Sequence, residues 1–154
     1  MSEHVLIDRP AALDGAVQVI RLNRPEKKNA ISRAMYATMA EALRAGDADE
    51  AVRVHVFFGV SGAFSAGNDM QDFLGYAEGG ALGEEVVDFL HTLAMTQKPM
   101  IAGVDGLAIG IGTTMQLHCD LSFATPRSQF RTPFVDLALV PEAGSSLLAS
   151  LLMG

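Results

Sequence analysis

Hydrophobic residues recur along the first third of the chain with two different spacings. Val17–Leu22 and Val52–Phe58 carry apolar residues in short runs or at every second position, which is typical of strands. Between them, the methionine and leucine residues that follow Ser32 recur at every fourth position, as on one face of a helix that Ser32 would cap. We therefore predict a strand, a helix and a second strand, with Gly46 ending the helix.

The rest of the chain continues this alternation of strand and helix patterns. The predicted strands are Met100–Val104, Leu121–Phe123, Gln129–Arg131 and Leu137–Leu139, and the predicted helices are Glu84–Gln97, Gly110–His118 and Glu142–Leu152, the last of them introduced by Pro141. Gly59–Gly67 is predicted to be a loop, and Gly75–Gly83, with four glycines, to be the most mobile segment. Strands that alternate with helices predict an α/β fold in a single domain.

Composition narrows the classes of function. The chain has 154 residues, 49% of them apolar, which suits a folded domain rather than a disordered chain. No apolar run reaches the ~18 residues of a membrane span, so we expect no membrane partner. Lys and Arg number 11 against 18 Asp and Glu, so the formal net charge is −7 and we expect no nucleic-acid partner.

Weaker indications of function and location come from the cysteine, the histidines and the N-terminal residues. A single cysteine, Cys119, excludes an internal disulfide and is expected to be a buried small hydrophobe. The N-terminal residues show neither the basic nor the apolar part of a signal peptide, so we expect a cytoplasmic location. The four histidines are scattered without the spacing of a metal site, and we predict none.

Two glycine-bearing turns, Ser65–Asp69 and Ala108–Gly112, each lie between a strand and a helix. Glycine permits backbone N–H groups to point into a cleft, and two such groups form an oxyanion hole for a carbonyl that gains negative charge. Ordinary strand-to-helix turns would show the same local pattern. A dinucleotide site is excluded, because Met115 stands where its fingerprint needs a small residue and no acidic residue follows at the ribose position.

Glu142 follows Pro141 at the predicted start of the last helix. A carboxylate there is a common structural cap, and the helix dipole would lower its pKa. A general base that works near neutral pH needs a raised pKa, which only removal from water could supply. The apolar neighbours Leu139, Val140 and Ala143 make such a surround feasible.

Five stretches are similar, in this order, to one family of enzymes. They are Leu22–Pro25 with Asn29–Ala30, Phe64–Asp69, Lys98–Gly112, Cys119–Asp120 and Phe130–Ser146. Together they resemble the crotonase (enoyl-CoA hydratase/isomerase) superfamily from Val17 to the last residue. The resemblance implies an α/β fold built as a repeated ββα spiral. It also implies that residues 1–154 are the N-terminal core of a longer unit, without the C-terminal helices that build a trimer or hexamer.

The same resemblance implies a binding site for an acyl-CoA thioester, with coenzyme A as part of the substrate and no separate cofactor. The thioester oxygen would meet the backbone N–H groups of Asn68 and Ile111, and Glu142 would be the catalytic residue. The remaining residues expected to contact the acyl-CoA are Lys28, Asn29, Ala30, Ala66, Gly67, Asp69, Met70, Gly110 and Phe134.

Two departures from the hydratase pattern indicate the reaction. The two glutamates with which hydratases of this family add water would fall at Thr114 and Phe134, and neither residue can act as a base. Glu142 is then the acidic side chain left at a catalytic position of the family. The chain is most similar to peroxisomal-type Δ3,Δ2-enoyl-CoA isomerases and their bacterial relatives. These shift a double bond from 3-enoyl-CoA to 2-enoyl-CoA in fatty-acid or related acyl-CoA degradation.

Two other functions remain open at this level. One is a different reaction of the same fold, such as hydration or the isomerisation of a dienoyl or ring substrate. The other is a non-catalytic acyl-CoA-binding or assembly subunit, which the missing C-terminal helices would favour.

Overall fold

The computed structural model of the chain describes residues 2–72 and 83–154. A five-stranded sheet in the order β1-β2-β3-β5-β7 forms one layer, and a three-stranded sheet in the order β4-β6-β8 lies at its end. The large sheet consists of β1 (Val5–Asp8), β2 (Val17–Leu22), β3 (Val54–Phe58), β5 (Met100–Val104) and β7 (Leu121–Ala124). The small sheet consists of β4 (Ala63–Ser65), β6 (Leu107–Ile109) and β8 (Gln129–Arg131).

Three successive units share one ββα plan. In each unit the first strand joins the large sheet, the second joins the small sheet, and a helix follows: β3-β4-α3, β5-β6-α4 and β7-β8-α5. Strands of successive units pair in parallel in both sheets, which stacks the units into a spiral. The helices are α1 (Arg33–Ala48), α3 (Glu84–Met95), α4 (Ile111–Thr114) and α5 (Ser145–Met153). The predicted α/β fold and its ββα spiral are confirmed.

Within residues 2–72 and 83–154, three short 3₁₀ turns lie between these elements. They are η1 (Ala11–Leu13), η2 (Pro25–Lys27) and η3 (Met115–His118). The last of them continues α4 without a break, so residues 111–118 form one short helical segment, as predicted.

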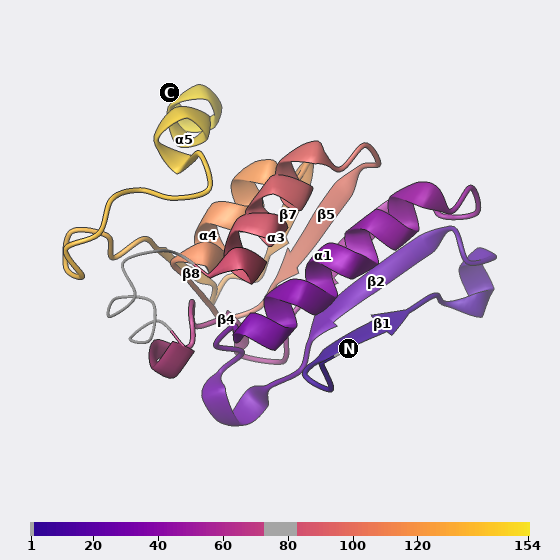
Figure 1. Ribbon diagram of the computed structural model, residues 1–154, viewed down its shortest axis with the longest axis horizontal. Coiled ribbons are helices and arrows are strands. Elements are labelled where there is room, and N and C mark those ends of the chain that lie inside the picture. The colour runs from indigo at the N-terminus through magenta and orange to yellow at the C-terminus, as the bar shows by residue number, and fades with distance from the viewer. Residues whose placement is uncertain (1, 73–82) are drawn as a thin grey trace.

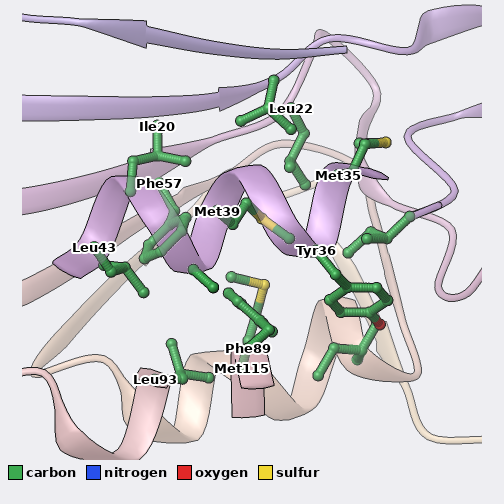
Figure 2. Packing of buried hydrophobic residues seen from close by; sticks show 14 of the residues in the cluster. Ile20, Leu22, Met35, Tyr36, Met39, Leu43, Phe57, Phe89, Leu93 and Met115 are labelled. Atoms are coloured by element: carbon green, nitrogen blue, oxygen red, sulfur yellow. The ribbon is translucent and has the colours of Figure 1, made fainter. Parts of the chain in front are cut away.

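The core lies between the large sheet and the helices α1 and α3 (Figure 1). Met35, Met39 and Leu43 on α1 are fully buried, as their spacing of four predicts. Figure 2 shows them facing Ile20, Leu22 and Phe57 of the sheet on one side and Phe89 and Leu93 of α3 on the other. This packing fixes strands β3 and β5 of the large sheet. The strands that follow them, β4 and β6, carry the site at their ends.

Several predicted boundaries are wrong for reasons of tertiary pairing. Strands β1, β4 and β6 were not predicted, because three or four residues carry too little pattern and the pairing partners lie far along the chain. α1 runs past Gly46 to Ala48, and α3 ends at Met95 rather than Gln97. The segment Gly75–Gly83 lies outside the described residues except for Gly83, the N-cap of α3.

The region from Leu137 to Gly144 differs most from the prediction. Leu137–Leu139 is a turn rather than a strand, since Ala138 has a positive φ of 53° and the N–H of Leu139 returns to the carbonyl of Phe134 at 2.8 Å. The last helix begins at Ser145, not at Pro141, because Ala143 adopts a left-handed φ of 52°. Glu142 therefore precedes the helix, in the long connection that leads to α5 (Figure 1).

Candidate active site

The two glycine-bearing turns lie against each other at the ends of β4 and β6. A Cβ atom on Gly67 would lie 3.1 Å from the carbonyl oxygen of Ile109, and one on Gly110 would lie 4.0 Å from the Cα of Gly67. Both glycines also have positive φ, 95° and 55°. At Gly67 the close approach leaves a side chain little room, and at both positions the positive φ favours glycine.

The predicted oxyanion donors sit one residue after these glycines. Asn68 forms an isolated parallel bridge with Ile31, whose own N–H and carbonyl bond to Gly67 and Asp69. In such a bridge the N–H of Asn68 points away from Ile31. Ile111 is the first residue of α4, where a backbone N–H has no acceptor inside the helix. Within the described residues, neither N–H has a hydrogen-bond acceptor, so both can bind an oxygen atom.

The segment 28–31 supports the Asn68 turn from behind. The N–H of Ala66 donates to the carbonyl of Lys28 at 2.9 Å. The fully buried Asn29 side chain donates to the carbonyls of Ala63 and Phe64 at 2.9 and 3.1 Å. Lys28, Asn29 and Ala30, which we predicted to contact the acyl-CoA, do not line the cavity described next: Asn29 is buried beneath the turn, and the side chain of Lys28 is exposed.

Asp69 also points away from the cavity. It forms a largely buried ion pair with Arg24, 2.6 Å from Oδ2 to the guanidinium nitrogen. Burial acts to raise the pKa of Asp69, but hydrogen bonds from Arg24 and the Gln71 N–H outweigh it and leave this pKa below its ordinary value. Asp69 thus anchors the turn as a carboxylate.

The residues that carry the two N–H groups, Asn68 and Ile111, help to line a mostly apolar cavity. It has an empty volume of about 540 Å³, part of it open to solvent. Eight of the twelve predicted site residues line it together with four further residues. The lining comprises Ala66, Gly67, Asn68, Met70, Ile109, Gly110, Ile111, Pro133, Phe134, Leu137, Leu139 and Glu142.

Glu142 is the one ionisable side chain among the described residues that line this cavity. Its Oε1 accepts a hydrogen bond of 2.6 Å from the hydroxyl of the fully buried Thr114. Burial raises the pKa of Glu142 above its ordinary value, and the Thr114 hydrogen bond offsets part of that rise. Of the three apolar neighbours considered from the sequence, Leu139 lines the cavity with Glu142, whereas Val140 is 82% exposed. Glu142 precedes α5 and so does not lie in the first turn of the helix, where the helix dipole would lower its pKa.

Two residues that sequence reasoning missed hold the site in position. The hydroxyl of Tyr36, on α1, donates a short hydrogen bond to the side-chain oxygen of Asn68. The Nε2 of His118 lies 2.8 Å from the carbonyl oxygen of Ala143, the residue after Glu142. Neither contact has a sequence signal, because the partners are 32 and 25 residues apart.

Other candidate groups lie outside this cavity. Cys119 is half-buried against the core, and burial with the nearby Asp120 charge raises the pKa of its thiol to about 12, which leaves no thiolate near neutral pH. Across residues 2–72 and 83–154, no group of three or more potential metal ligands is found. In the same ranges no helix has the length and apolar character to cross a membrane.

Comparison with known proteins gives a consistent set of similarities. Residues 13–151 match the family described as enoyl-CoA hydratase/isomerase. The chain is 37% identical over 146 residues to "Enoyl-CoA delta isomerase 2" of Rattus norvegicus, covering 92% of the chain and 37% of that protein. It is 36% identical over 137 residues to a protein of Rhizobium meliloti (strain 1021) named as an enoyl-CoA hydratase, covering 86% of the chain and 51% of that protein.

A solved structure is also similar. A protein of Magnetospirillum magneticum AMB-1, described as an enoyl-CoA hydratase/carnithine racemase, superimposes with a TM-score of 0.91 at 47% identity. The superposition covers 99% of this chain and 58% of that protein. The chain thus spans about a third to a half of the length of the curated relatives described above.

Proposed function

Since the chain belongs to the enoyl-CoA hydratase/isomerase family, we propose that it converts a 3-enoyl-CoA thioester to the 2-enoyl-CoA isomer, with Glu142 as the single acid–base group. The observation that carries the proposal is the cavity lining. Glu142 is the one ionisable side chain among its described residues, and it lies in the same cavity as the residues that bear the two free N–H groups, Asn68 and Ile111.

The proposed reaction needs one base on one face of the substrate. The Glu142 carboxylate removes a proton from C2 of the 3-enoyl thioester, and the electron pair delocalises onto the thioester oxygen as a dienolate. The N–H groups of Asn68 and Ile111 stabilise that negative charge. The protonated Glu142 then returns the proton to C4, and the double bond comes to lie between C2 and C3. No atom is gained or lost.

The raised pKa of Glu142 and its hydrogen bond to Thr114 suit both the removal of the proton from C2 and its return to C4. Burial raises its pKa, which makes the carboxylate a stronger base than an exposed one. The Thr114 hydroxyl occupies one carboxylate oxygen at 2.6 Å and leaves the other for the substrate.

The apolar lining favours isomerisation over the addition of water. Phe134, Leu137 and Leu139 line the cavity together with Glu142. An apolar surround keeps water away from the dienolate and from the conjugated product. Thr114 and Phe134 have no carboxylate, so a two-carboxylate activation of water is not available at these positions.

The proposed substrate follows from this chemistry, and an oligomeric state and a location are proposed beside it. The substrate is an acyl-CoA thioester, with no separate cofactor, and the whole protein works as a homo-oligomer in the cytoplasm. Lys28 is exposed at the end of η2, next to the buried Asn29, where it can meet the anionic coenzyme A moiety outside the cavity.

The decisive variant is Glu142→Gln, which keeps the shape and the hydrogen-bond acceptor for Thr114 but removes the base. With 3-hexenoyl-CoA as substrate, we expect kcat to fall by about 10³-fold or more, as the loss of a general base does. Glu41→Gln, an exposed change of the same kind on α1, should leave kcat unchanged. Near-normal isomerisation by Glu142→Gln would exclude Glu142 as the base.

The products distinguish the alternative functions. Incubation of a 2-enoyl-CoA in water should give little 3-hydroxyacyl-CoA, and rapid hydration with slow isomerisation would instead favour a hydratase. Binding of acyl-CoA without turnover at high protein concentration would favour a non-catalytic binding subunit.

A further inference from the structure

The imidazole of His118 lies beside the backbone that carries Glu142, although it does not line the cavity. We propose that His118 is a positioning residue that fixes the Glu142 carboxylate by holding the carbonyl oxygen of the next residue, Ala143. The proposal rests on the proposed role of Glu142 as the base.

Glu142 needs such support because most of the connection that carries it is exposed, although Ala143 itself packs against the core. It lies in the connection between β8 and α5, outside any regular element. In this connection Val135 is 91% exposed and Val140 is 82% exposed, so buried apolar area does little to fix the backbone. Segments with few buried contacts open locally at low free-energy cost. Specific hydrogen bonds must then determine where the carboxylate lies.

Three hydrogen bonds hold Glu142 and Ala143. The Thr114 hydroxyl bonds Oε1 of Glu142 at 2.6 Å, and His118 Nε2 lies 2.8 Å from the Ala143 carbonyl oxygen. The N–H of Ser145 closes the turn onto the Glu142 carbonyl at 2.9 Å. The first bond holds the side chain, the second holds the backbone, and the third is local.

One short helical segment supplies both long-range contacts. Residues 111–118 begin with Ile111, whose N–H is one oxyanion donor, and carry Thr114 and His118 four residues apart. Because Met115 of the same segment is fully buried in the core, the segment is a rigid reference for the site. His118 thereby ties the position of the base to the position of the oxyanion donor.

The direction of the His118 hydrogen bond follows from its partner. A carbonyl oxygen only accepts, so Nε2 must carry the hydrogen. Both the neutral ring protonated on Nε2 and the imidazolium satisfy this requirement. The contact therefore does not depend on the charge of the ring, and an amide side chain of similar reach can replace it.

Loss of this contact should affect catalysis more than binding. Without His118 the left-handed Ala143 would lose its long-range partner, and Glu142 would leave its place beside Thr114 more often. A misplacement of about 1 Å in a reacting group can cost about 10²-fold in rate. The donors Asn68 and Ile111 keep their own supports, so substrate affinity should change little.

The test compares His118→Leu, which removes the donor, with His118→Gln, which restores an N–H at a similar distance. For isomerisation of 3-hexenoyl-CoA, we expect His118→Leu to lower kcat by about 10- to 100-fold with KM changed less than about threefold. We expect His118→Gln to recover most of the lost rate. His91→Leu, an exposed histidine on α3, is the matched control and should behave like the unchanged protein.

A readout independent of activity is the hydrogen exchange of the Ser145 amide, which reports on the turn that contains Glu142. It should become about tenfold faster in His118→Leu and return toward its original rate in His118→Gln. An unchanged kcat and an unchanged exchange rate in His118→Leu would overturn the proposal. So would equal losses in both variants accompanied by a lower Tm, since that pattern means a general loss of folding.

The two proposals fail in different ways. If Glu142→Gln stays active, the assignment of the base is wrong and His118 positions no catalytic group. If Glu142→Gln is inactive while His118→Leu keeps its kcat, the base is right and its positioning by His118 is wrong.

Discussion

At the scale of single residues, the surroundings of Glu142 decide its chemistry. The sequence shows a glutamate after a proline, which is most often a structural cap. The structure places it instead in an apolar cavity with one hydroxyl partner, Thr114, and burial raises its pKa. Removal of this carboxyl from water raises its pKa, which suits the role of base proposed for it.

The raised pKa of Glu142 predicts a pH-dependent stability. A group whose pKa is higher in the folded state stabilises the fold while it is protonated, and this contribution is lost as pH rises through the folded pKa. Near neutral pH, Glu142→Gln should therefore have a higher Tm than the unchanged protein. The difference should vanish below about pH 4.5, the ordinary value, where both side chains are neutral. Thermal melts at the two pH values measure this, and a lower Tm of the variant near neutral pH would contradict it.

At the scale of elements, α4 packs closely on β4, and this contact joins the two segments that carry the proposed oxyanion donors, Asn68 and Ile111. Gly112 makes this contact possible, because a Cβ there would lie 2.9 Å from both the Cβ and the carbonyl oxygen of Ser65. The Ser65 hydroxyl in turn bonds the Asn29 carbonyl at 2.9 Å and accepts from the Gly67 N–H at 3.1 Å. A shift of α4 would therefore reach the Asn68 turn directly.

Gly112→Ala tests this packing. In a helix alanine is normally favoured over glycine by about 1 kcal/mol, so propensity alone predicts a more stable protein. The contact with the Ser65 backbone predicts the opposite, a loss of about 1–3 kcal/mol in the free energy of unfolding, as overpacking usually costs. Urea denaturation measures the sign. A variant as stable as the unchanged protein would mean that α4 is free to move away from β4.

At the scale of the whole molecule, the C-terminal third is more exposed than the rest. All four residues of the edge strand β7 are exposed, and Phe123 on it is 64% exposed. On α5, Leu147, Leu151, Leu152 and Met153 are exposed as well. Large exposed apolar areas are uncommon on monomers and mark surfaces that associate.

This exposure predicts self-association of the 154-residue polypeptide. Sedimentation velocity should show a mean mass that rises with concentration up to about 100 µM. Replacing Leu151 and Leu152 by serine should reduce the association, because α5 then presents less apolar surface. Leu13→Ser, a change of the same kind in η1, should not. A strictly monomeric polypeptide at every concentration would contradict the prediction.

The sequence by itself determined the elements whose pattern is long enough to read. In α1, α3, β2 and β3, the spacing of apolar residues reflects the burial of one helix face or of a strand within one short segment. The local pattern was therefore enough to predict these four elements. The resemblance of five stretches added the family and named eight of the twelve residues that line the cavity.

Only the tertiary structure decided what depends on partners far along the chain. β4 and β6 exist because they pair with each other, with Ala63 opposite Leu107. The bonds from Thr114 to Glu142 and from His118 to Ala143 join residues 28 and 25 positions apart. Such contacts form when packing brings the segments together, and no local pattern of hydrophobic and polar residues encodes them.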